Sequence, residues 1–131
     1  MTITPIYAAV LALLFFGLAV NVVRTRRRAG VSLGDGGDKL LARRIRAHGN
    51  FVEYVPMALI LMVMIEERGA EAVLVHGLNG ALVLGRLMHA FALSSLTLRP
   101  FHRTGGVALT LFVIVVAVVQ ILRDAIGAAL G

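Results

Sequence analysis

Charged and amide side chains recur along one face at the start of a long apolar segment. They are spaced three or four residues apart, in the order Arg43, Arg46, Asn50 and Glu53. At 3.6 residues per turn this spacing places them in one polar stripe, with His48 and Tyr54 close beside it. These groups offer donors and an acceptor suited to a small zwitterionic ligand with several carboxylates. Because charge at membrane depth is costly, the stripe predicts a functional site.

The polar stripe also has a structural interpretation. Arg46 and Glu53 could form an internal ion pair that holds helices together. We favour ligand binding because an amide and a phenol accompany the pair. Pro56 follows Glu53 and is expected to bend the helix, since it removes a backbone donor. That bend is either an ordinary feature of a membrane helix or a kink that opens the bundle around the stripe.

A second apolar segment carries Arg86 and His89, three residues apart and therefore on one face. Arg86 lies about ten residues from the predicted helix end, too far to extend easily to the membrane surface. Gly77, Ala81 and Gly85 recur at intervals of four, a pattern typical of close helix packing. The four histidines lack carboxylates at metal-ligand spacing, so we predict no metal site.

The composition is that of an integral membrane protein, so membrane helices must position these side chains. The 131 residues are 59% hydrophobic and 15% charged, with a mean hydropathy of +0.89. This length allows one small helical bundle. The chain has no cysteine, which excludes a disulfide framework, a zinc–cysteine site and a cysteine nucleophile. Long unbroken apolar runs such as 107–119 favour helices over the alternating strands of a barrel.

Hydropathy predicts four spans in a single domain, residues 1–131, that is, an all-α integral membrane four-helix bundle. The spans cover about residues 4–23, 40–66, 72–96 and 106–126. The first span lacks a preceding basic region, so we interpret it as retained rather than as a signal peptide. A Gly/Asp-rich loop over 29–38, a short turn over 67–70 and a break over 99–106 separate the spans.

Basic residues are concentrated in the first and third connections. The positive-inside rule therefore places these connections in the cytoplasm and both termini on the non-cytoplasmic side. We attribute the net charge of +6 mainly to these basic residues on the cytoplasmic side. Basic residues flank the spans without interleaved aromatic residues, so we expect no nucleic-acid partner. Attraction to anionic lipid is the simplest role for the arginines between 24 and 28.

Three segments carry a family resemblance. Arg46-Ala47-His48-x-Asn50-x-x-Glu53-Tyr54-x-Pro56 resembles the second-helix signature of the MAPEG family, the membrane-associated proteins of eicosanoid and glutathione metabolism. Gly85-Arg86-Leu87-x-His89 is similar to the third-helix signature. Gly34-Asp35-Gly36-Gly37 resembles a loop in the family's small bacterial branch. The resemblance covers essentially the whole chain.

The resemblance implies a homotrimer in the bacterial inner membrane, with active sites between subunits that face the cytoplasm. Many family members bind glutathione and conjugate it to lipophilic electrophiles, or reduce lipid peroxides. By position, glutathione would be held by Arg43, Arg46, His48, Asn50, Glu53, Tyr54, Arg86 and His89. Arg99 would activate the thiol, with Arg103 as its rival. The partners implied are membrane lipid and a lipophilic small molecule.

The implied chemistry needs no protein cysteine, because the ligand supplies the sulfur. A thiol with a pKa of about 8.5 is mostly protonated at neutral pH, and its thiolate is the nucleophile. A guanidinium within hydrogen-bond reach stabilises that thiolate and stays charged.

Two alternatives remain open. His89 and Leu93 occupy positions where many glutathione-using members carry tyrosine, so the chain could be a catalytically silent member that binds lipid or another thiol. Alternatively, Glu53 could be the membrane carboxylate of a small proton-coupled multidrug exporter. The neighbouring arginines would oppose a lipophilic cation, which makes this second alternative the weaker one.

Overall fold

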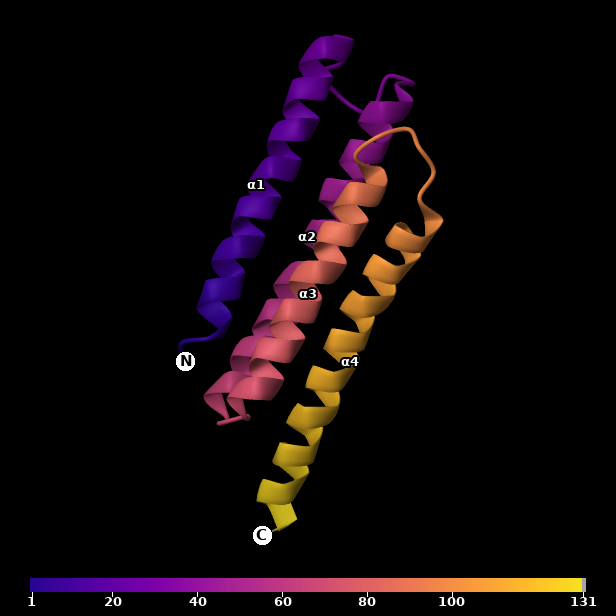
Figure 1. Cartoon of the computed structure of the whole chain (residues 1–131). Helices are drawn as coiled ribbons and strands as arrows, with labels where there is room; N and C mark the ends of the chain where they lie inside the picture. The colour runs from indigo at the N-terminus through magenta and orange to yellow at the C-terminus, as the bar shows by residue number, and fades with distance from the viewer. Residues whose placement is uncertain (131) are drawn as a thin grey trace.

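The computed structural model describes residues 1–130, which form a bundle of four helices and contain no strand. The helices are α1 (Thr4–Ala29), α2 (Lys39–Glu67), α3 (Ala72–Leu93) and α4 (Pro100–Leu130). Successive helices alternate in direction. The two ends of the chain therefore lie at the same end of the bundle as the α2–α3 turn, and both longer connections lie at the other end (Figure 1). The prediction of an all-α four-helix bundle is confirmed.

Three helices, α1, α2 and α4, are long and apolar enough to cross a membrane. The remaining helix, α3, has 22 residues and carries Asn79, Arg86 and His89, all of them buried. Both α1 and α4 pack against α2 and α3, which form the central pair (Figure 1). The polar side chains of α3 thus face the interior of the bundle, which is where polar groups of a membrane protein are tolerated.

The predicted break over 99–106 is wrong. The last helix begins at Pro100, since proline suits the first turn of a helix, and it continues through Gly105 and Gly106. A Cβ atom built on Gly106 would lie 2.5 Å from the carbonyl oxygen of Gly85. Gly85 and Gly106 therefore allow the backbones of α3 and α4 to approach closely. Of the predicted small-residue stripe, Gly85 has this packing role, whereas a Cβ on Gly77 would meet open space.

The start of α1 is held by a side chain from the end of α2. The carboxylate of Glu66 accepts hydrogen bonds from the backbone N–H groups of Thr2, Ile3 and Thr4 at 2.6, 2.7 and 2.8 Å. The N-cap position of α1 makes no side-chain capping bond of its own. Because the first N–H groups of a helix lack intrahelical partners, Glu66 supplies the missing cap.

We expect Glu66→Ala to reduce the stability of the bundle by about 1 to 2 kcal/mol, the usual cost of losing a helix cap. Thermal unfolding in detergent micelles, followed by circular dichroism, measures the change. Glu71→Ala is the matched control, because Glu71 precedes α3 without a side-chain capping bond. Equal unfolding midpoints for the two variants would contradict the capping role.

Candidate functional site

The polar residues of α2 point in two directions. Asn50 is buried, with 4% of its surface exposed. The side chains of Arg46 and Glu53 are 59% and 50% exposed on the outside of the subunit. The prediction of a single polar stripe is therefore wrong at Asn50, which lies on the inward edge of that face.

Arg86 is the centre of the inward group. Its Nη1 donates to Oδ1 of Asn50 at 2.9 Å, and its Nη2 donates to the carbonyl oxygen of Gly106 at 3.4 Å. It is only 2% exposed, so its guanidinium joins α2, α3 and α4 inside the bundle rather than reaching the membrane surface. Across residues 1–130, no carboxylate forms an ion pair with it. The buried charge is thus balanced by amide and carbonyl dipoles, and its Nε has no partner.

Arg46 and Glu53 form the outward group. Nη1 of Arg46 lies 3.3 Å from Oε1 of Glu53. The pair borders a pocket of about 430 Å³, which the α1–α2 loop closes on one side with Gly34 and Asp35. We call this the Arg46–Glu53 pocket. Because an exposed ion pair contributes little to stability, Arg46 and Glu53 can separate at small cost and each bind a charged group of a ligand.

The α1–α2 loop owes its shape to glycine. Gly34, Gly36 and Gly37 have φ values of 65°, 57° and 82°, a region that side chains disfavour. Oδ1 of Asp35 accepts from the N–H of Gly37 at 2.9 Å, and Asp38 caps α2 by accepting from Leu41. The Gly/Asp-rich segment therefore forms a defined wall beside Arg46.

A second pocket, of about 460 Å³, lies where α2 meets the end of α3 and the start of α4. It contains Arg43, Arg99 and Arg103, and we call it the three-arginine pocket. Arg43 donates to the carbonyl oxygens of Ala92 and Thr97 at 2.7 and 3.1 Å, so it caps the end of α3. This structural use was not predicted for Arg43.

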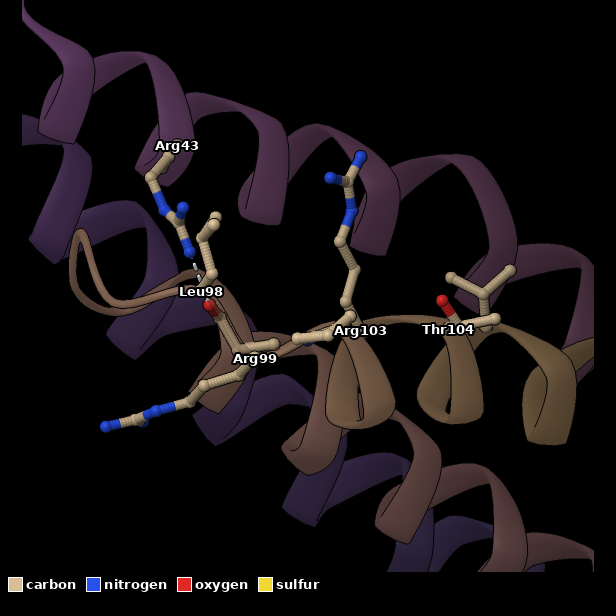
Figure 2. Close-up of a pocket in the computed structure, with 8 residues that line it drawn as sticks. Arg43, Leu98, Arg99, Arg103 and Thr104 are labelled. Carbon is tan, nitrogen blue, oxygen red and sulfur yellow. Dashed lines mark hydrogen bonds between the residues drawn. The ribbon is translucent and has the colours of Figure 1, made fainter.

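The other two arginines of this pocket differ in orientation. Figure 2 shows Arg103 extending toward α2, whereas Arg99 points away from both Arg43 and Arg103. The guanidinium carbon of Arg99 lies 3.8 Å from the centre of the Phe91 ring, and its Nη1 donates to the carbonyl oxygen of Phe91 at 3.3 Å. Arg103 is exposed, so its guanidinium is the more accessible to a ligand.

The remaining predicted ligands are dispersed. The His48 ring lies against Phe15, with ring centres 5.0 Å apart, and therefore faces α1. Tyr54 is half-buried next to Glu53, and His89 is buried beside Gly106. Within the described part of the chain, no three His, Asp or Glu side chains converge in a way that could hold a metal ion.

Sequence reasoning missed Gly106 as a partner of Arg86. Its carbonyl oxygen accepts from Arg86 and also from the hydroxyl of Thr110, at 2.9 Å. The signal was available in the Gly105-Gly106 pair, which reads as a break but also marks a site of close helix contact.

Comparisons with known proteins give a consistent result. The model of the MAPEG family matches residues 4–123. The inner membrane protein YecN of Escherichia coli K12 is 44% identical over 89 residues, which cover 68% of this chain and 68% of that protein. The protein of the same name from Escherichia coli O6:H1 strain CFT073 gives the same values. No solved structure matches significantly.

Proposed function

Because the chain belongs to the MAPEG family, we propose that it is a membrane-bound glutathione-dependent transferase acting on lipophilic electrophiles. Its three apolar helices and its similarity to an inner membrane protein support an integral inner membrane location. In the proposed reaction, the glutathione thiol loses its proton and the sulfur forms a bond to an electrophilic carbon. That carbon releases its leaving group or opens its ring.

The exposed Arg46–Glu53 pair beside its pocket carries the proposal. Glutathione has two carboxylates and one ammonium group. The guanidinium of Arg46 can take a carboxylate in a paired hydrogen bond, and Glu53 can take the ammonium. The pair is open to the outside of one subunit, so in the proposed homotrimer a neighbouring subunit would cover the ligand. The buried Arg86–Asn50 bond would keep this stretch of α2 in place against α3.

The three-arginine pocket is the proposed place for the thiol. The family resemblance implies Arg99 as the activating residue, with Arg103 as its rival. In this conformation Arg99 is held on the Phe91 ring, and Arg103 reaches toward α2. We therefore assign the thiolate contact to Arg103 and give Arg99 a positioning role at the pocket wall.

We expect Arg103→Ala to raise the thiol pKa of bound glutathione by about one unit, or about 1.4 kcal/mol, because the thiolate loses a guanidinium. Arg99→Ala should leave this pKa near its wild-type value. The ultraviolet absorbance of the thiolate, titrated against pH in the presence of saturating protein, measures both. A rise in Arg99→Ala alone would return the activating role to Arg99, and no rise in either variant would exclude both.

The activity itself is tested with purified protein in detergent, glutathione and 1-chloro-2,4-dinitrobenzene as a general electrophile. The proposal predicts a conjugation rate above the uncatalysed reaction that saturates with glutathione. Saturable glutathione binding without conjugation of any lipophilic electrophile in a panel would make the protein a silent member of the family.

A further inference from the structure

Another pocket lies between α1, α2 and α3, separate from the two pockets described above. Its volume is about 360 Å³. Leucines line one end, among them Leu14 of α1 and Leu87 of α3. The other end carries the polar side chains of Asn21 in α1, Arg44 in α2 and Ser94, the residue that follows α3. We call it the α1–α3 pocket.

The polarity of the α1–α3 pocket follows from the direction of the helices. Asn21 comes two turns after Leu14 in α1, and Ser94 follows Leu87 at the end of α3. Arg44 lies near the start of the oppositely directed α2. All three polar groups therefore gather at the end that holds both long connections (Figure 1). From Leu13 to Asn21 the wall extends about 12 Å, at about 1.5 Å per residue.

Positive charge surrounds the polar mouth of this pocket. A guanidinium N–H of Arg44, on α2, donates to the hydroxyl of Thr25, on α1. This hydrogen bond holds the Arg44 side chain against α1. The pocket face of α1 continues past Asn21 at helical spacing with Arg24 and Arg28. The ion pairs among residues 1–130 involve none of these three arginines. The mouth is therefore basic, and no acidic side chain among residues 1–130 pairs with it.

We propose that the α1–α3 pocket binds one anionic phospholipid. Its phosphate lies against Arg44, with Arg24 and Arg28 nearby, and one acyl chain lies along the leucine-lined end. Guanidinium groups pair well with phosphate oxygens, and basic pockets between membrane helices suit anionic headgroups. The lipid fills the gap between α1 and α3 and so stabilises α1. This inference does not depend on the proposed transferase activity.

Gly17 provides a direct test, since it lines the pocket and a Cβ there would meet nothing within 4 Å. In Gly17→Leu the new Cβ meets no protein atom, and the rest of the side chain extends into the space proposed for the lipid. Gly77→Leu is the matched control, because Gly77 is an exposed helical glycine with equally open surroundings. Delipidated full-length protein is mixed with phosphatidylglycerol or phosphatidylcholine in detergent micelles. Lipid retention is read by native mass spectrometry, and stability by thermal unfolding.

The wild type and Gly77→Leu should retain phosphatidylglycerol in preference to phosphatidylcholine and unfold at a higher temperature with it. Gly17→Leu should lose both effects. Arg44→Gln should weaken phosphatidylglycerol retention about tenfold, the scale of one lost charge-assisted hydrogen bond. Thr25→Val removes the hydrogen bond to Arg44 but keeps the positive charge of Arg44, so this variant should still prefer phosphatidylglycerol. It therefore shows whether the weaker retention in Arg44→Gln follows from the lost charge.

Three outcomes would overturn the proposal. Equal retention of the two lipids by the wild type would show that the arginines at the mouth do not select an anionic headgroup and only orient the protein in the membrane. Unchanged retention in both Gly17→Leu and Arg44→Gln would place the lipid elsewhere. Displacement of phosphatidylglycerol by an equal concentration of oleate would assign the pocket to a carboxylate amphiphile.

Discussion

Replacing Arg46 with alanine is expected to weaken glutathione binding by about 30- to 150-fold. The substitution removes a guanidinium that would pair with a ligand carboxylate, an interaction of about 2 to 3 kcal/mol. The side chain of Arg46 is 59% exposed and makes one ion pair, so the fold should not change. Glu53→Gln keeps the size of the side chain but loses its charge, and we expect a similar loss through the ammonium group. Equilibrium dialysis with labelled glutathione measures both variants.

Arg68→Ala is the matched control for these variants. Arg68 is an exposed arginine at the opposite end of α2, beyond the last helical turn. Its replacement should leave glutathione binding unchanged. If Arg46→Ala and Glu53→Gln bind glutathione as the wild type does, the ligand does not use the Arg46–Glu53 pocket, whatever the activity of the protein.

The second large effect concerns the contact between α3 and α4. In Gly106→Ala the new Cβ would lie 2.5 Å from the carbonyl oxygen of Gly85 and 2.9 Å from the backbone nitrogen of His89. Both are backbone atoms, so the helices must move apart. We expect a loss of stability of about 2 to 3 kcal/mol, the upper range for overpacking. Moving α4 would also disturb the hydrogen bond from Arg86 to the Gly106 carbonyl.

Gly127→Ala in the same helix should instead increase the stability of the bundle. A Cβ at Gly127 meets nothing within 4 Å, and alanine is favoured over glycine in a helix by up to about 1 kcal/mol. Thermal unfolding of the two variants in the same detergent compares them directly. A midpoint for Gly106→Ala at or above that of Gly127→Ala would show that the glycine contact does not hold α3 against α4.

Local patterns were sufficient for the architecture. Long apolar runs separated by Gly-rich or charged connections predict four helices, and the structure has a helix on each of the four segments. The burial of Arg86 also followed from its position deep in an apolar segment. These inferences succeed because hydropathy depends on composition alone, and a polar group in the middle of a membrane helix has few places to go except the interior.

Packing decided what local patterns could not. Asn50 lies one turn from Arg46, but its place on the edge of the helix face leaves its direction to the neighbouring helices, and Arg86 draws it inward. Arg43 has the charge of a ligand residue, yet it donates hydrogen bonds to a carbonyl group at the end of α3 and to another in the connection to α4. The Gly105-Gly106 pair resembles a helix break in the sequence, because only the structure shows that Gly106 packs against Gly85. Each case depends on a partner more than 12 residues away in the sequence.

We propose that the outward polar groups of α2 hold a small anionic peptide at the membrane surface. The decisive experiment is a calorimetric titration of the purified wild-type protein with glutathione. We expect saturable heat with at most one site per subunit, and a dissociation constant that is about 30- to 150-fold higher in Arg46→Ala. The absence of any heat of binding in the wild type, under conditions where the helices remain folded, would contradict it.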